Sequence, residues 1–488
     1  MLFNSWTFAV FLVVVFFLHY LGRSAAYQAL VLTVGSFVFY GWGADHLRLV
    51  PLLIASTLIN GVAAQVLLSP VASLGRKKTA FGLALAFNLA ALGFFKYARL
   101  IGQSLLPAAV WAQWEPTLGH IPLPVGISFY TFQGISLICE AWRVRSTGLP
   151  GLEAPKGVQH TLWFHLKVWF FKAFFPQLIA GPIVKAHEFL HQIGFKRLRD
   201  IDWDGAVRKL VLGFFLKMVI ADNLTEATGA LDQPDQFEVS SRLNLLAMLY
   251  GFSFQIFSDF AGYSLIAQGL AKLFGYELPI NFNFPYLSQS ITEFWRRWHI
   301  SLSSWLREYL YIPLGGNRFG IGRTYLNLFL VMFLGGLWHG AEWRFAAWGT
   351  AHGLLLAAER LFQGQGRRGT GKPGWTMARI LRAVLVFNVI SVLWLLFKLP
   401  HFSSILTFFK AFAGPGGAVH TRDIFAIALF SLPPIAWHFW AAMRERIEVG
   451  KQSPGSRLPQ LELAVYGVML ALIVLNPGTA GEFIYFQF

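Results

Sequence analysis

The chain has 488 residues, of which 55% are hydrophobic and only 13% are charged. Soluble domains carry roughly 25% charged residues, so this composition excludes an ordinary soluble protein and indicates an integral membrane protein. Lys and Arg number 40 against 24 Asp and Glu, an excess that is typical of basic cytoplasmic loops between spans. The basic residues are scattered over several loops, which disfavours nucleic-acid binding. One cysteine excludes an internal disulfide, and no Cys and His spacing of a metal site is present.

Apolar runs recur along the whole chain, and each is a candidate membrane helix. They lie at residues 8–21, 29–42, 49–68, 79–95, 122–139, 162–183, 207–220, 245–273, 325–340, 345–362, 383–397, 424–440 and 461–475. A spanning helix needs around 20 mostly apolar residues, and several runs are shorter or interrupted by Pro and Gly. We therefore expect an all-α polytopic membrane protein with about 11 to 13 transmembrane and re-entrant helices, in a single domain over residues 1–488. The run at 122–139 is either a broken or re-entrant segment or a kinked span.

Loop charges predict the orientation of the spans. Basic residues gather at about 185–209, 296–323 and 367–382, whereas acidic residues dominate the loop at 222–238. Because positively charged loops face the cytoplasm, we expect the acidic loop on the outer side of the membrane. The first run has no preceding Lys or Arg, which disfavours a cleaved signal peptide and predicts a retained first span.

The segment at 290–311 has the pattern of an amphipathic helix at the cytoplasmic membrane interface. Ser290 followed three residues later by Glu293 is a capping-box start signal. Large apolar residues at three- and four-residue spacing form one stripe, which consists of Trp295, Trp298, Leu302, Trp305 and Tyr309. Arginines and serines occupy the opposite side. His299 lies at the boundary, where an imidazole is either a functional group or only a polar tip.

His339 lies near the end of a long apolar run, where an ionisable group is costly and marks a functional site by default. Gly335 and Gly336 precede it by one turn and Gly340 follows it, so little side-chain volume surrounds the imidazole. A substrate could fill that space, or another helix could pack there on the small residues. His352 repeats the pattern in the next run, and we expect it to be a supporting polar contact.

Asp259 and Tyr263 lie inside the apolar segment at 251–269. A carboxylate in a span needs a partner, which we expect to be a histidine or arginine of the stretch at 286–340. The contact is either a structural ion pair or part of a catalytic site, and the residue types do not separate these alternatives.

Two histidines in apolar surroundings, without a metal site or a Gly-x-Ser-x-Gly elbow, favour acyl transfer to a hydroxyl group. An imidazole accepts the hydroxyl proton as the oxygen attacks a thioester or ester carbonyl, and its ordinary pKa suits that task. A second histidine or a nearby arginine could stabilise the oxyanion or the leaving group. The alternative function is a transporter or flippase of lipid-linked or acylated material, with the histidines as gate or proton-relay residues.

Two sequence blocks resemble the membrane-bound O-acyltransferase (MBOAT) family, and in particular its bacterial branch typified by alginate O-acetyltransferase. They are TEFWRRWHISLSSWLREYLYIPLGGNR at 292–318 and LGGLWHGAEWRFAAWGTAHG at 334–353. Shorter matches are SFVFYGW, FFKYA, PVGISFYTFQ, FPQLIAGPI, FSDFAGYS and the terminal FIYFQF. The resemblance implies a bundle of helices around a central cavity or tunnel, with a catalytic core at about 120–362.

The resemblance also implies roles for individual residues. His339 at the LWHG position is the implied catalytic histidine, and His299 at the RWH position is a second functional histidine. Substrate contacts are expected from Arg296, Arg297, Trp298, Asp259, Tyr263, Trp338 and His352. No metal and no permanently bound cofactor are expected.

The implied function is an acetyltransferase subunit in the bacterial inner (cytoplasmic) membrane. It takes acetyl from a cytoplasmic donor, acetyl-CoA or another, and passes it across the membrane. A periplasmic acetyltransferase partner, working with the polysaccharide synthesis and export complex, then acetylates an extracellular polymer such as alginate or cellulose. D-alanyl transfer to teichoic acids is a related alternative.

Overall fold

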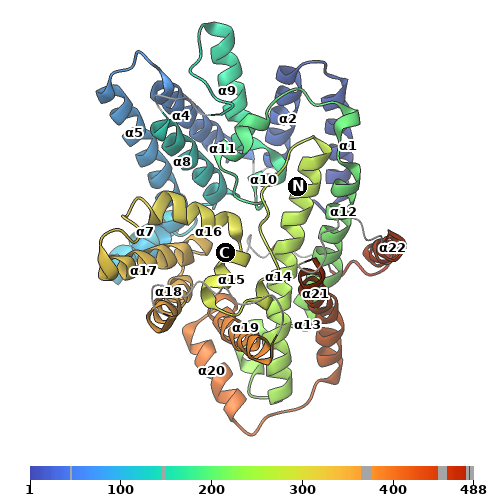
Figure 1. The fold of residues 1–488 in the computed structure, drawn as a ribbon. Coiled ribbons are helices and arrows are strands. Elements are labelled where there is room, and N and C mark those ends of the chain that lie inside the picture. Colours follow the sequence, from blue (N-terminus) through green and yellow to red (C-terminus); the bar gives the residue numbers. More distant parts are fainter. Residues whose placement is uncertain (44–46, 145–149, 364–375, 449–458, 480–482, 484–488) are drawn as a thin grey trace. The chain divides into compact units, whose positions relative to one another are not determined.

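A computed structural model of the chain describes residues 1–43, 47–144, 150–363, 376–448, 459–479 and 483. Within these residues every regular element is a helix (Figure 1), and one isolated strand-like bridge joins Ser240 to Ala418. The predicted all-α fold is confirmed. Most of the basic loop predicted at 367–382 and the end of the terminal FIYFQF motif lie outside the described residues.

Six helices among the described residues are long and apolar enough to cross a membrane. They are α4 (Val50–Leu68), the segment Leu74–Leu105 that contains α5 (Leu74–Leu92) and α6 (Ala98–Leu105), α14 (Arg242–Leu273), α17 (Gly320–His339), α19 (Met377–Lys398) and α21 (Thr421–Glu448). Shorter apolar helices are α1 (Trp6–Leu21), α2 (Ala25–Tyr40), α20 (Phe402–Ala413) and α22 (Pro459–Leu475). These helices confirm a multi-pass membrane protein, while the total number of spans and the central cavity stay predictions.

The chain forms two compact units. The first consists of residues 1–210 and 266–279, and the second consists of residues 211–265 and 280–488. Two helices, α12 (Trp203–Phe214) and α14, contribute residues to both units. A single domain with a catalytic core at about 120–362 stays a prediction.

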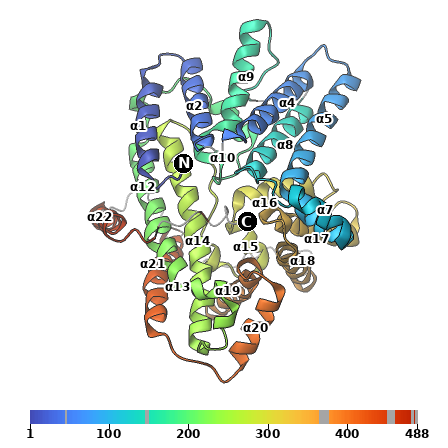
Figure 2. The ribbon, with the colours of Figure 1, turned by 180° about the vertical axis from the view of Figure 1, so that it is seen from behind.

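In the first unit, α4, α5 and α8 (Ile127–Arg143) pack against one another, as both ribbon views show (Figures 1 and 2). The buried amides of Asn60 on α4 and Asn88 on α5 exchange two hydrogen bonds, of 3.2 and 2.8 Å. Gly134 lets α8 approach this pair, because a Cβ there would lie 2.7 Å from Asn60 Nδ2. The helix begins after Gly126, whose φ of 73° is left-handed. The run predicted at 122–139 is therefore irregular only before α8, which has no break.

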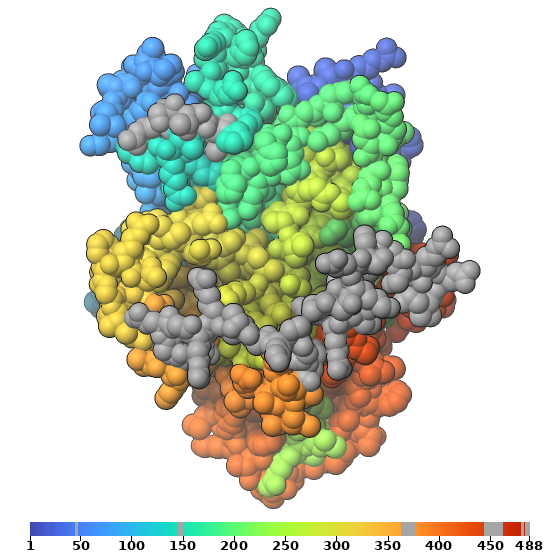
Figure 3. All heavy atoms as spheres, viewed as in Figure 1, coloured from blue at the N-terminus to red at the C-terminus, as the bar shows by residue number. Residues whose placement is uncertain are grey.

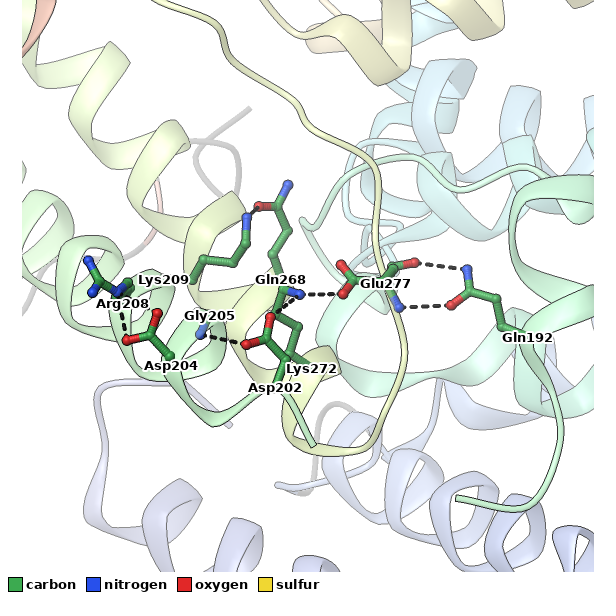
Figure 4. A network of polar contacts seen from close by, with 9 residues as sticks. All are labelled: Gln192, Asp202, Asp204, Gly205, Arg208, Lys209, Gln268, Lys272 and Glu277. Atoms are coloured by element: carbon green, nitrogen blue, oxygen red, sulfur yellow. Dashed lines mark hydrogen bonds and ion pairs between the residues drawn. The ribbon is translucent and has the colours of Figure 1, made fainter. Parts of the chain in front are cut away.

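A polar network fastens the end of α14 within the first unit (Figure 4). Lys272 pairs with Asp202 at 2.8 Å and also with Glu277. Gln192 exchanges hydrogen bonds with the backbone of Glu277, at 3.1 and 2.8 Å. The hydrogen bond from Lys272 lowers the pKa of the exposed Asp202 carboxyl. Exposed pairs of this kind contribute little to stability, so the network mainly orients the polar loops at this end of the unit.

The second unit contains the two predicted histidine blocks. Its short helical elements include the π-helical η4 (Phe215–Ala221), α13 (Asp222–Ala227), α15 (Ile291–Arg297), α16 (Ile300–Leu306) and the π-helical η8 (Arg307–Tyr311). Its long helices include α18 (Trp343–Gln363). Residues 317–323, which comprise the end of the turn before α17 and the first turn of that helix, are exposed and belong to the yellow part of the surface in Figure 3.

Glycines bring α17 and α18 into backbone contact. A Cβ at Gly336 would lie 2.2 Å from the carbonyl oxygen of Phe345, and a Cβ at Gly349 would lie 2.1 Å from the carbonyl oxygen of Met332. Only residues without a side chain permit this approach, which is a common way for membrane helices to associate. This contact lies one turn before His339, which is the last residue of α17.

Candidate functional site

The helix predicted at 290–311 is interrupted in the middle. It begins as predicted, because the Ser290 hydroxyl accepts a hydrogen bond of 3.1 Å from the N–H of Glu293. The chain then leaves the helix after α15 and re-enters it as α16, so Trp298 and His299 belong to neither. The prediction of a single continuous helix with one apolar stripe is therefore wrong, because the break interrupts the regular spacing on which the stripe depends.

His299 lies at this break and points inward. Its φ of 43° and ψ of 54° are left-handed, a conformation that costs energy for a residue with a Cβ and is concentrated at functional sites. The side chain is fully buried, so the prediction that His299 lies at the boundary between an apolar and a polar helix face is also wrong. Its ring contacts Phe260, with centroids 4.6 Å apart. Burial lowers the pKa of His299 to about 3, and the imidazole is neutral at pH 7.

Asn281 is a residue of this site that sequence reasoning missed. Its Oδ1 atom lies 3.0 Å from His299 Nδ1, and it accepts hydrogen bonds from the hydroxyl and the N–H of Ser301 at 2.9 and 3.3 Å. Its Nδ2 atom donates to the Ser264 hydroxyl at 3.0 Å. Asn281 lies in a segment that is neither helix nor strand, so no periodic pattern marks it.

His339 is the last residue of α17, and it is 3% exposed. The centroid of its ring lies 6.2 Å from that of His299. Among the described residues, the rings of Trp338, Trp348 and Phe397 also contact it, at centroid distances of 5.0, 5.2 and 5.5 Å. The structure thus brings the two predicted histidines together within the second unit.

The glycines near His339 serve helix packing. Gly336 lies against the backbone of α18, and a Cβ at Gly340 would lie 2.1 Å from the ring of Phe345. A Cβ at Gly335 would meet only the end of the Leu306 side chain, at 3.1 Å. The sequence left two explanations for these glycines, space for a substrate or close packing of another helix. Packing against α18 accounts for Gly336.

His352 is joined to the histidine pair through aromatic rings. The indole N–H of Trp295 donates to His352 Nδ1 at 3.2 Å, so in the neutral imidazole the proton resides on Nε2. The His352 ring contacts Trp348 at 4.7 Å, and Trp348 contacts His339 on its other side. Among the described interactions, none joins His352 directly to His339. The supporting role of His352 stays a prediction.

Two of the predicted substrate contacts, both tryptophans, lie beside the histidines. Trp338 lies with its ring centroid 5.8 Å from His299 and also contacts the ring of His339. Trp298 is fully buried next to His299 in the chain. Tyr263 is buried and packs against Phe483, with centroids 4.5 Å apart.

The two predicted arginines differ in their surroundings. Arg297 pairs with Glu293 at 2.9 Å and accepts, through its backbone oxygen, a hydrogen bond from the N–H of Asn283. Arg296 is exposed. Arg297 therefore holds α15 to the segment that carries Asn281, which is a structural contact.

Asp259 pairs with a lysine. Its Oδ1 atom lies 2.8 Å from Lys217 Nζ, and the same ammonium lies 2.7 Å from Asp222 Oδ1. All three side chains are buried. We predicted that a histidine or arginine at 286–340 pairs with Asp259. The structure instead pairs Asp259 with Lys217, a lysine of η4. Lys217 meets the criterion that identified Asp259, an ionisable group within an apolar run, so the sequence did contain the signal.

The arrangement suits proton transfer by an imidazole. Two imidazoles lie side by side, and aromatic rings line the side of His339. Such surroundings exclude water, which strengthens electrostatic interactions within the site. A neutral imidazole in this setting can accept a proton and return it within one reaction cycle.

Residues 156–402 match the sequence model of MBOAT, the membrane-bound O-acyltransferase family. A peptidoglycan O-acetyltransferase from Helicobacter pylori is 35% identical over 418 residues, which cover 82% of this chain and 77% of the relative. A probable alginate O-acetylase from Azotobacter vinelandii is 37% identical over 403 residues, with coverage of 82% and 75%. A teichoic acid D-alanyltransferase from Bacillus subtilis is 29% identical over 329 residues, with coverage of 63% and 78%.

Proposed function

Because the chain belongs to the membrane-bound O-acyltransferase family, we propose that it moves acetyl groups from a cytoplasmic donor across the bacterial inner membrane for O-acetylation of an extracellular polysaccharide. Family membership itself makes the chain a multi-pass membrane O-acyltransferase. The relatives that act on alginate and peptidoglycan support a polysaccharide acceptor. The observation that carries the proposal is the buried pair of His299 and His339, whose ring centroids are 6.2 Å apart.

In the proposed reaction His339 is the general base. Its imidazole takes the proton of an acceptor hydroxyl while the hydroxyl oxygen forms a bond to the acetyl carbonyl carbon of a thioester donor. The tetrahedral oxyanion then collapses, the carbon–sulfur bond breaks, and the imidazolium returns the proton to the leaving thiolate. Positioned acid–base catalysis of this kind contributes about 10²- to 10⁴-fold to the rate. The rings of Trp338, Trp348 and Phe397 exclude the water that would hydrolyse the acetyl group.

His299 is the second functional histidine of the proposal, on the donor side of His339. Trp338 contacts both imidazole rings, which makes it the best supported of the proposed substrate contacts. Trp298 and His352 contribute to the aromatic surroundings. Asp259 pairs with Lys217, and its proposed role is to hold the polar interior of the unit together.

Acetyl-CoA is the proposed donor, as a substrate and not as a resident cofactor. The proposed partners are a periplasmic acetyltransferase and the complex that synthesises and exports the polymer. Similarity to probable alginate O-acetylases supports a place for the chain in a pathway that contains other proteins.

The first test measures polymer acetylation in cells that express the wild type, His339→Ala or His401→Ala at matched protein levels. His401 is an exposed histidine that precedes α20, so its replacement controls for the loss of any histidine in the same unit. We expect His339→Ala to abolish acetylation and His401→Ala to preserve it. Normal acetylation in cells that carry His339→Ala would refute the catalytic role of this residue.

The second test supplies acetyl-CoA, labelled in its acetyl group, to the purified protein in proteoliposomes. Label found covalently on a hydroxyl acceptor supports acyl transfer, whereas intact donor that crosses the bilayer unchanged indicates a transporter. A matched donor that carries a D-alanyl thioester tests the alternative that the similarity to teichoic acid D-alanyltransferases supports. Transfer of D-alanyl in place of acetyl would assign the chain to that alternative.

A further inference from the structure

We propose that Asn281 is a positioning residue that holds His299 as a neutral proton acceptor, with the proton on Nδ1 and the lone pair on Nε2. This inference rests on the proposed function, in which His299 acts beside His339. It assigns a role to a residue outside both histidine blocks.

The hydrogen bonds decide which way the Asn281 amide is oriented. The backbone N–H of Ser301 can only donate, so the side-chain atom that it contacts at 3.3 Å is the amide oxygen. The Ser301 hydroxyl lies 2.9 Å from the same oxygen, and the amide nitrogen donates to the Ser264 hydroxyl at 3.0 Å. A flipped amide would direct its N–H₂ group at the N–H of Ser301, which is repulsive. The orientation is therefore determined by contacts that do not involve the histidine.

The oriented amide determines the tautomer of His299. An amide oxygen accepts hydrogen bonds and cannot donate one, so the atom 3.0 Å from it, His299 Nδ1, must carry the proton. In a neutral imidazole the other nitrogen, Nε2, then carries a lone pair. Because burial lowers the pKa of His299 to about 3, this neutral tautomer is the form present at pH 7. In this form Nε2 accepts a hydrogen bond from a hydroxyl or thiol and cannot donate one to an oxyanion.

The backbone groups of Asn281 and Asn283 also hold the left-handed conformation of His299. The N–H of Ile300 donates to the Asn281 carbonyl at 2.9 Å, and the N–H of Asn283 donates to the Arg297 carbonyl at 2.9 Å. These two bonds hold the chain on both sides of the break at His299. The side-chain bond to Nδ1 then fixes the rotation of the ring itself.

Three variants separate positioning from a merely structural role. Asn281→Leu has similar volume and removes the acceptor, whereas Asn281→Asp retains an acceptor and adds a negative charge. Asn327→Leu is the matched control, because Asn327 is a fully buried amide of the same unit that donates to the backbone carbonyls of Leu314 and Gly316. All three are measured for thermal unfolding and for acetyl transfer between about pH 4 and pH 8, the range that covers the shifted His299 pKa.

We expect Asn281→Leu to lower kcat by about 10²-fold with little change in KM, which is the loss that follows when a positioned acid–base group is misaligned. Asn281→Asp is expected to retain transfer at pH 8 and to lose it as the pH falls through about 4 to 6. A carboxylate partner raises the His299 pKa from about 3 by about 1 to 3 units, and protonation removes the Nε2 lone pair. Asn327→Leu is expected to lower stability and to leave the shape of the pH profile unchanged.

A second readout does not depend on the reaction. Nitrogen-15 NMR of histidine-labelled protein, compared with His299→Gln to identify the resonances, reports the tautomer and the pKa of His299. We expect a proton on Nδ1 in the wild type, a mixture of tautomers in Asn281→Leu and a raised pKa in Asn281→Asp. If neither the wild type nor any variant transfers acetyl but these spectra change as described, the proposed function fails and the positioning role stands. An unchanged tautomer in Asn281→Leu, together with an activity loss no greater than that of Asn327→Leu, overturns the positioning role.

Discussion

Replacement of Gly336 by alanine tests whether the contact between α17 and α18 sets the position of His339. The added Cβ would lie 2.2 Å from the carbonyl oxygen of Phe345 and 3.0 Å from the N and Cα atoms of Gly349. All of these are backbone atoms, which cannot rotate away as a side chain can. An ordinary contact begins at 3.4 Å, so the two backbones must separate by the difference from 2.2 Å, roughly 1.2 Å.

This separation has two expected consequences. Overpacking of a well-packed contact costs about 1–3 kcal/mol of unfolding free energy, which thermal unfolding in detergent would detect. His339 lies on the same helix, one turn after Gly336, so it is displaced with α17. A misplacement of about 1 Å at a catalytic group lowers the rate by about 10²-fold. Acetyl transfer is therefore expected to fall more steeply than stability.

Gly335→Ala is the matched control, because the same methyl group is added one residue earlier on the same helix. Its Cβ would meet only Leu306 Cδ1, at 3.1 Å, and the end of this flexible side chain can move aside. We expect the control to retain nearly wild-type stability and activity. If Gly336→Ala behaves like Gly335→Ala in both assays, the contact between α17 and α18 does not position His339 and the reasoning is wrong.

Three further predictions concern buried polar groups. Lys217→Met removes a cation from two buried carboxylates, including Asp222, and is expected to lower the unfolding free energy by about 3–5 kcal/mol; a loss below 1 kcal/mol in denaturant unfolding would contradict this. Trp295→Phe removes the indole donor to His352 Nδ1 and is expected to cost about 1–3 kcal/mol, whereas an unchanged melting temperature would show that the bond is dispensable. The folded-state pKa of His299 is about 3, so between that value and the ordinary value of about 6.5 only the unfolded chain binds the proton. As the pH is lowered from 7.5 to 5.5, the free energy of unfolding is therefore expected to decrease by about 1.4 kcal/mol because of this group. Unfolding of His299→Gln, measured at both pH values, should lack this decrease.

Local signals in the sequence predicted several features of the site. The start of α15 follows from Ser290 and Glu293, because capping depends on residues three positions apart. His339 is conspicuous because an imidazole in an apolar run is costly wherever that run folds. The membrane class follows from composition, since a chain so poor in charge cannot cover a soluble surface, and the all-α class follows from the recurring apolar runs.

The tertiary structure alone decided how these residues meet. The left-handed conformation at His299 depends on hydrogen bonds to the irregular segment of Asn281. Histidine is enriched in this conformation, but only a few per cent of residues with a side chain adopt it, so the residue type alone does not reveal it. The partner of Asp259 depends on which helix packs beside α14, and that helix supplies Lys217. Periodicity reports which face of one helix is apolar, whereas these contacts join segments far apart in the chain. The residue types for acyl transfer were therefore visible in the sequence, while the orientation that makes His299 a proton acceptor required the folded chain.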